Sequence, residues 1–165
     1  MGRVVNLEDL IKEREAARAS GKRLVFTNGC FDILHRGHVE LLRAAKAMGD
    51  LLCVAVNSDR SVRKLKGARR PIVPEADRAA VLAALAAVDF VVIFDQDTPA
   101  EVISRVRPDV LVKGSDYAAG EIVGKEDVER DGGIVSRFPL VGGLSTETLL
   151  TEIARRYKDL VKPDS

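Results

Sequence analysis

Short, uninterrupted apolar runs alternate along the chain with longer stretches in which apolar residues recur every three or four positions. A run that is apolar at every position is typical of a strand covered on both faces, as in a parallel sheet. Helices that join such strands cover the two faces, so the alternation predicts an α/β protein with a Rossmann-like, five-stranded parallel sheet flanked by helices. The predicted strands comprise residues 23–28, 51–57, 89–94, 109–114 and 132–138.

Capping and breaking residues predict where several helices begin and end. Asn6 is suited to cap a first helix that ends at Gly21, and Thr98 is suited to cap a later helix that stops at Pro108. The remaining amphipathic stretches predict helices over residues 37–48 and 75–87, a short helix before the fifth strand, and a last helix after a Ser/Thr cap.

The segment of residues 58–74 lacks a clear period and is polar, basic and turn-rich. Because it follows a predicted strand, we interpret it as a ligand-binding loop. No repeat or linker divides the chain, so residues 1–165 are predicted to form one domain, with an N-terminal helical segment over 1–21 and a frayed tail over 158–165.

Polar residues collect at the end of each predicted strand and just after it. In a parallel sheet the carboxyl ends of the strands share one edge, and ligands bind there at a switch in strand order. Most of these residues can donate hydrogen bonds, which suits an anion and phosphate above all. They are Asn28, Gly29, Asp32, His35 and His38; Asn57, Ser58, Asp59, Lys64, Lys66, Arg69 and Arg70; Asp95, Asp97 and Thr98; Lys113, Gly114, Ser115 and Asp116; and Gly142, Gly143, Ser145 and Thr146.

Both histidines of the chain lie in one turn, at His35 and His38, near Cys30 and on either side of Gly37. A zinc site needs about four nitrogen or sulfur ligands, and no second Cys–His pair is present. A Cys–His nucleophile pair requires a poised thiolate, and structural packing of both rings is a further alternative. The fourth interpretation is a phosphate clamp, in which two imidazoles donate to phosphate oxygens above a helix N-terminus. The position of the turn, after a strand and before a helix, favours this last interpretation.

Composition narrows the class of protein further. The chain has 165 residues, of which 46% are hydrophobic and 31% charged, and its 26 Lys+Arg nearly balance its 25 Asp+Glu. This balance gives no reason to expect binding to nucleic acid or to a membrane. Two cysteines and the lack of a signal-peptide pattern favour a cytoplasmic protein.

The segment "TNGCFDILHRGHVELL" resembles the H-x-G-H motif, in its longer form, of the cytidylyltransferase-like family of nucleotidyltransferases. The blocks "VAVNSDRSVRKLKGARRPI", "FDQDTP", "DVLVKGSDY", "IVGKEDVERDGG" and "GLSTETLL" are similar to those of bacterial D-glycero-β-D-manno-heptose 1-phosphate adenylyltransferases, in their stand-alone form. The resemblance implies a nucleotidyltransferase fold, a homodimer, and transfer of AMP from ATP with Mg²⁺ on the triphosphate, so that no protein side chain need bind metal. A cytidylyltransferase for a polyol or amino-alcohol phosphate and a non-catalytic nucleotide-binding regulator stay as alternatives.

The resemblance also implies roles for matched residues. His35, His38 and Lys113 are the expected catalytic residues. The residues expected to bind ATP are Asn28, Gly29, Cys30, Phe31, Asp32, His35, Gly37, His38, Lys113, Gly114, Gly143, Ser145 and Thr146. Those expected on the sugar-phosphate side are Asn57, Asp59, Lys64, Arg69, Arg78, Asp116 and Tyr117. Asp32 is expected to orient the turn rather than to act as a base.

The chain departs from related glycerol-phosphate cytidylyltransferases before the last helix. They carry an arginine shortly before an I-S-T-T block, whereas no arginine lies between Phe138 and Ser145 in this chain. Glu147 replaces the second threonine of that block. A carboxylate there favours the helix N-terminus but repels a phosphate, so its side chain is expected to point away from the ligand.

Overall fold

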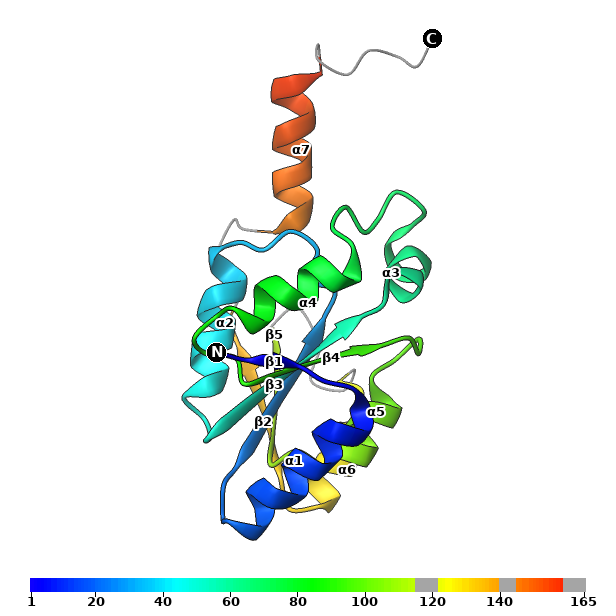
Figure 1. Cartoon of the computed structure of the whole chain (residues 1–165). Helices are drawn as coiled ribbons and strands as arrows, with labels where there is room; N and C mark the ends of the chain where they lie inside the picture. The colour runs from blue at the N-terminus through cyan, green and yellow to red at the C-terminus, as the bar shows by residue number, and fades with distance from the viewer. Residues whose placement is uncertain (115–121, 140–144, 159–165) are drawn as a thin grey trace.

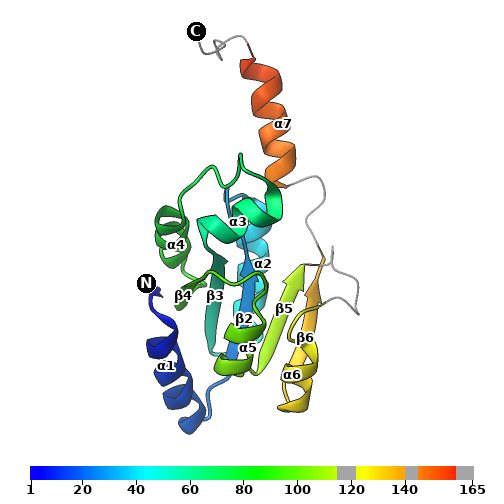
Figure 2. The ribbon, with the colours of Figure 1, turned by 90° about the vertical axis from the view of Figure 1, so that its right-hand side faces the viewer.

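The computed structural model describes residues 1–114, 122–139 and 145–158. Within them the chain forms one parallel sheet of six strands in the order β1-β4-β3-β2-β5-β6, and Figure 2 shows β4, β3, β2, β5 and β6 side by side. The strands are β1 (Arg3–Val4), β2 (Leu24–Gly29), β3 (Leu51–Asn57), β4 (Phe90–Phe94), β5 (Val110–Gly114) and β6 (Ile134–Phe138).

The predicted α/β class and parallel sheet are confirmed, but the number of five strands was wrong. The additional strand β1 has two residues, both exposed, and Arg3 pairs with Phe90 at the edge of the sheet. A strand this short carries no apolar alternation, so its formation depends on the edge that β4 offers. The other five strands coincide closely with the predicted runs.

The strand order reverses at β2. The chain passes from β2 to its neighbour β3, and later crosses back to β5 on the other side of β2, where Phe26 pairs with both Cys53 and Leu111. Helices at such a switch leave on opposite faces of the sheet, which opens a crevice at the carboxyl ends of these strands.

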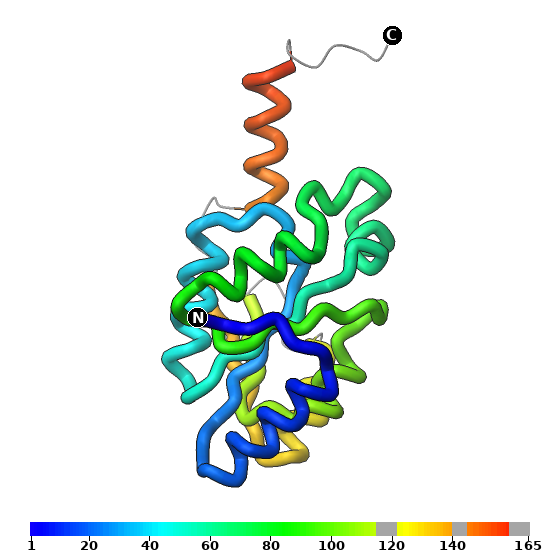
Figure 3. Tube along the Cα trace, viewed as in Figure 1, coloured from blue at the N-terminus to red at the C-terminus, as the bar shows by residue number. Residues whose placement is uncertain are grey.

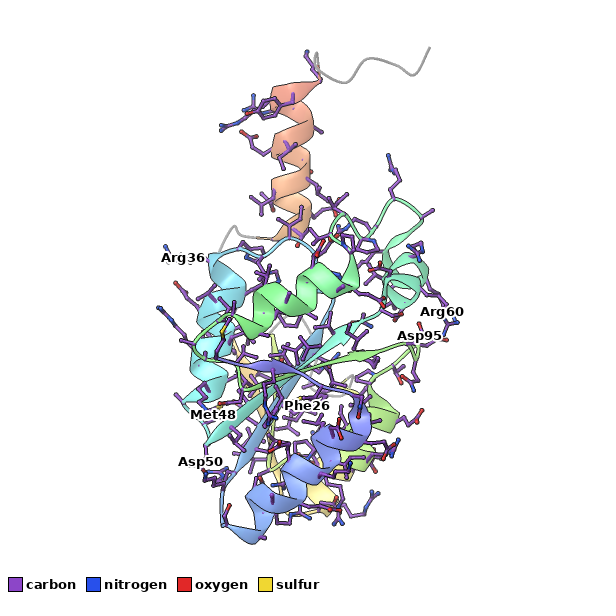
Figure 4. All side chains as sticks on the ribbon, viewed as in Figure 1. Phe26, Arg36, Met48, Asp50, Arg60 and Asp95 are labelled. Carbon is purple, nitrogen blue, oxygen red and sulfur yellow. The ribbon has the colours of Figure 1, made fainter. Side chains whose placement is uncertain are left out.

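Helices cover both faces of the sheet, as Figure 1 shows. One core layer lies under α1, α5 and α6, where Leu10, Ile103 and Val128 pack against sheet residues such as Phe26, which Figure 4 labels near the centre of the protein. The other layer lies under α2 and α4 and includes Leu42 and Leu82. The helices are α1 (Leu7–Ala19), α2 (Arg36–Lys46), α3 (Asp59–Lys66), α4 (Glu75–Ala83), α5 (Ala100–Val106), α6 (Lys125–Arg130) and α7 (Thr146–Tyr157).

Capping explains where the sequence-based helix limits were right and where they were wrong. Asn6 Oδ1 accepts a hydrogen bond from the Asp9 N–H at 2.8 Å, and the chain turns after α1 at Gly21 with φ +71°. Thr98 does not cap α5, which begins after Pro99, and α4 ends at Ala83 rather than Ala87.

The basic segment after β3 is not simply a loop, because its first half forms α3. The Ser58 hydroxyl accepts from the Ser61 N–H at 3.0 Å and so caps this helix. Val62 is its one fully buried apolar side chain, and a single anchor gives too weak a period to recognise in the sequence.

The last helix, α7, extends away from the body of the protein (Figures 1 and 3) and buries none of its residues. None of the helices in the described ranges combines the length and the apolar content that a membrane span requires.

Candidate active site

The histidine turn lies between the end of β2 and the start of α2. The His35 and His38 rings stack with their centroids 3.8 Å apart and their planes at 27°. Phe31 adds a third ring, 5.2 Å from that of His38. The imidazoles thus form a pair at the N-terminus of an eleven-residue helix, where the helix dipole attracts negative charge.

Phe31 gives this turn its shape. Its backbone has φ +48°, in the left-handed region that bulky residues rarely adopt, while its side chain is buried under α2. Gly29 leaves room for the ring, since a Cβ on Gly29 would lie 3.2 Å from Phe31 Cε2. Strain of this kind is maintained where the surrounding structure fixes it, often next to a functional site.

Hydrogen bonding determines which nitrogen of His38 carries the proton. The His35 backbone N–H donates to His38 Nδ1 at 3.4 Å, so the neutral ring of His38 holds its proton on Nε2. Burial, with a smaller contribution from His35, lowers the pKa of His38 to about 4. Burial also lowers the pKa of His35, whose buried Nδ1 has no hydrogen-bond partner in the described part of the chain. At neutral pH both rings are therefore uncharged and can donate one N–H each.

We expect an NMR titration of the imidazole signals to show this depression directly. One ring should titrate near pH 4 and the other below 6.5, whereas both should titrate near 6.5 in the urea-unfolded chain. Because the chain has two histidines, the His38→Gln variant assigns both signals. A midpoint for His38 at or above 6.5 would contradict the buried, neutral pair.

Asp32 holds the loop that follows α3. Its carboxylate accepts from the N–H groups of Ile72 at 2.8 Å and Val73 at 2.9 Å, and from the Arg70 guanidinium. Burial alone would raise the pKa of Asp32, but the N–H groups of Val73 and Ile72 together with Arg70 outweigh it, and the pKa lies below its usual value. A carboxylate bound in this way organises the turn, and its lowered pKa makes it a poor base.

A cavity of about 290 Å³ opens beside the histidine turn, at the carboxyl ends of β2, β3 and β5. Among the predicted residues, it brings together Asn28, Gly29, Cys30, Asn57 and Lys113. Lys113 is buried and donates to Asn28 Oδ1, which holds its ammonium group at the switch point of the sheet. The cavity lies on the α5–α6 side of the sheet, and the histidine turn lies on the α2 side. The cavity residues and the histidines therefore flank the carboxyl end of β2 from opposite faces of the sheet.

The basic residues after β3 divide into three positions. Lys64 is exposed and forms an ion pair with Asp97, and it does not line the cavity. Lys66, two residues later, lines the cavity and also the groove beside α7 in which Arg69 lies. The sequence-based assignment placed Lys64 and not Lys66 on the sugar-phosphate side, because the choice depends on the helical turn of α3 that was not recognised.

Arg78, which was predicted to contact a sugar phosphate, is engaged within the protein in this structure. Its side chain is fully buried and donates to the carbonyl oxygens of Val73 at 2.9 Å and Asn57 at 2.8 Å, to the Cys30 carbonyl, and to Asp59 Oδ1 at 2.8 Å. Arg78 therefore joins the ends of β2 and β3 to the loop before α4. Asp59, as its ion-pair partner, is likewise engaged within the protein.

The start of α7 carries the remaining described residues of the predicted ATP site. The Ser145 hydroxyl accepts from the Thr148 N–H at 3.0 Å and caps the helix. Glu147 is exposed and lies 3.7 Å from Arg70, so its carboxylate is directed at the basic loop. The predicted residues Gly143, Asp116 and Tyr117 lie outside the described residues.

The two alternative chemistries of the histidine turn gain no support. Burial raises the pKa of the Cys30 thiol, so the thiolate that a nucleophile requires is disfavoured. Within the described ranges, no three His, Cys, Asp or Glu residues are placed to hold a metal ion.

The fold, the histidine pair at a helix N-terminus and the cationic crevice define a nucleotidyltransferase domain. The family model described as Cytidylyltransferase-like matches residues 26–153, and the chain belongs to this family. The resemblance noted in the sequence is thereby confirmed.

Several curated proteins are similar to this chain over most of its length. The chain is 54% identical over 151 residues to the bifunctional protein HldE of Geotalea uraniireducens, and 55% identical over 148 residues to HldE of Koribacter versatilis. These matches cover 92% and 90% of this chain but 31% and 30% of the relatives, so the chain spans about a third of their length.

Solved structures agree with the fold. A lipopolysaccharide core biosynthesis protein from Thermoplasma volcanium is 29% identical with a TM-score of 0.61, over 73% of this chain and 98% of that one. A pantoate–β-alanine ligase from Francisella tularensis has a TM-score of 0.67, over 99% of this chain and 80% of that one, at 14% identity, which is evidence for the fold alone.

Proposed function

We propose that this domain transfers AMP from ATP to D-glycero-β-D-manno-heptose 1-phosphate, giving ADP-heptose and pyrophosphate. Similarity to HldE over nine-tenths of the chain, and to a lipopolysaccharide core biosynthesis protein from Thermoplasma volcanium, supports a sugar-nucleotide activity. The observation that carries the proposal is the stacked, uncharged His35–His38 pair at the N-terminus of α2. The proposal includes a cytoplasmic location, a homodimer, and no binding to nucleic acid or membranes.

The reaction needs no covalent intermediate. A phosphate oxygen of the sugar phosphate forms a bond to the α-phosphorus of ATP, while the bond from that phosphorus to the bridging oxygen breaks and pyrophosphate leaves with the electron pair. Since the attacking phosphate is already ionised at neutral pH, no general base is required, and catalysis consists of positioning and charge stabilisation.

The described residues supply these two contributions. His38 Nε2–H and one N–H of His35 donate to oxygens of the triphosphate, where negative charge develops at the α-phosphorus. Lys113 adds a buried positive charge in the cavity, and the first turn of α7 adds N–H donors. Asp97 lines the cavity but pairs with Lys64, and Asp32 already accepts from three donors, so Mg²⁺ would be held by the triphosphate oxygens, where it would neutralise charge.

Because Lys66 lines the cavity, we expect its ammonium group to contact the sugar phosphate, which accepts AMP in the proposed reaction. We expect Lys66→Ala to raise KM for the sugar phosphate by about tenfold or more, because it removes a charge-assisted contact in the cavity. Arg63→Ala is the matched control, since Arg63 is an exposed cation of the same helix that lines neither the cavity nor the groove beside α7, and its KM should change less than about twofold. Equal effects of the two variants would show that the basic segment acts as a diffuse charge and not through Lys66.

A turnover assay separates the proposal from its alternatives. Pyrophosphate release should require ATP together with heptose 1-phosphate and should not be supported by CTP. Turnover with CTP and a polyol phosphate, without ATP turnover, would establish the cytidylyltransferase alternative. ATP binding with no turnover on any sugar phosphate would establish a nucleotide-binding regulator.

A further inference from the structure

Helix α7 carries an apolar stripe that the rest of the chain does not cover. Its members, Leu149, Leu150, Ile153, Ala154 and Tyr157, recur at helical spacing, and Ile153 and Tyr157 are 49% and 53% exposed. Every other helix in the described ranges buries at least one residue, whereas α7 buries none. Because an isolated twelve-residue helix is marginal in water, this stripe requires a partner.

Resting on the homodimer of the proposed function, we propose that the two copies meet through α7, which packs antiparallel against α7 of the second copy. Thr146, Leu150, Ile153 and Tyr157 follow the 4-3-4 spacing of a coiled-coil seam. This spacing is symmetric about the point between residues 151 and 152. An antiparallel pair therefore places Leu150 of each copy against Ile153 of the other, as an isologous two-fold interface requires.

The charges of α7 select the antiparallel orientation. Glu147 lies in the first turn, whereas Arg155, Arg156 and Lys158 lie at the other end, where both arginines share the one carboxylate of Glu152 and the net charge is positive. Antiparallel packing brings the acidic start of one helix to the basic end of the other and opposes the two helix dipoles. On one flank of the seam, Glu147 then lies within reach of Lys158 of the second copy. Parallel packing would instead place like charges side by side.

A groove at the base of α7 extends this surface. It lies between α7 and the loop after α3, and Ile72, 55% exposed, faces Leu150 and Ala154 across it. A stable interface buries about 1,200–2,000 Å² in total, more than three helical turns supply by themselves. The end of the second copy's α7, with Tyr157, reaches this groove in the antiparallel arrangement. The groove also includes Arg70 and Glu147, so the interface adjoins the loop that Asp32 holds.

Sedimentation velocity of the full chain tests the proposal. The wild type should sediment as a dimer with twice the mass of one chain, and the double variant Ile153→Asp/Tyr157→Asp should sediment as a monomer. Val81→Asp, which alters an equally exposed apolar residue on α4, should remain dimeric. Circular dichroism and the melting temperature establish that each variant is folded. A wild type that is monomeric at every soluble concentration, or a double variant that stays dimeric, would overturn the proposal.

Disulfide trapping tests the orientation. Of the two native cysteines, Cys53 is buried and Cys30 is half-buried beside the cavity, and neither lies on α7. Mixing Leu150→Cys with Ile153→Cys chains should give a cross-linked pair in much higher yield than either variant alone. Preferential 150–150 and 153–153 cross-links would show parallel packing, and no cross-link above that of the wild type would show that α7 packs elsewhere.

Discussion

Replacing His38 with alanine is expected to lower kcat for nucleotidyl transfer by about 10³-fold, because removing one preorganised donor at a site of developing charge costs about 10²–10³-fold and His35 loses its stacking partner as well. The ring of His38 lies against those of His35 and Phe31, so its removal releases both neighbours. Single-turnover measurement of pyrophosphate release reports the chemical step without contributions from product release.

Two further variants within the His35–His38 motif serve as controls. Arg36→Ala should keep kcat within about twofold, because Arg36 is 71% exposed and pairs with Glu40, and Figure 4 shows it on the outer side of α2. His38→Gln keeps an N–H donor in a similar volume and should recover at least part of the loss. If His38→Ala turned over as fast as the wild type while remaining folded, the imidazole pair would be excluded from transition-state stabilisation.

The sheet could be predicted because its buried strands are runs of apolar residues in the sequence. Phe26, Val54 and Leu111 lie in runs that are apolar on both faces, and such runs leave few alternatives to a parallel sheet. β1 and α3 were missed for one common reason. Neither element has a clear apolar pattern in its own sequence. β1 forms by pairing with β4, and α3 is stabilised by the Ser58 cap and the burial of Val62.

The candidate site was predicted at the level of turns and not of individual side chains. Position at or after the end of a strand located the histidines, Asp32 and Lys113, since the carboxyl edge of a parallel sheet brings together the residues at which its strands end. The position of a residue relative to a strand does not predict the direction in which its side chain points. Lys64 and Lys66 differ only in their place on α3, and Arg78 looks like a ligand-binding cation until its acceptors within the protein are known.

Arg78→Met should destabilise the fold by about 3–5 kcal/mol, the usual consequence of removing one partner of a buried ion pair. The methionine fills a similar volume, but Asp59 loses its counter-ion and the carbonyl oxygens of Cys30, Asn57 and Val73 lose their donor. Urea denaturation measures the change in the free energy of unfolding. Arg60→Met is the matched control, because Arg60 pairs with Asp95 on the surface, as Figure 4 shows, and this change should cost less than about 1 kcal/mol.

Measuring kcat and KM for Arg78→Met and Arg60→Met distinguishes a structural role of Arg78 from a role in ligand binding. The assays are run at a low temperature at which circular dichroism shows both variants to be folded. A residue that binds the sugar phosphate would raise its KM without affecting KM for ATP. Arg78 instead connects the Cys30 carbonyl, which precedes the histidine turn, with Asn57 at the end of β3. Its loss should therefore lower kcat and raise both KM values, and Arg78→Lys should restore stability only in part because one ammonium group cannot reach all of these acceptors. A normal free energy of unfolding with a selective rise in KM for the sugar phosphate would return Arg78 to the ligand-binding role that the sequence first indicated.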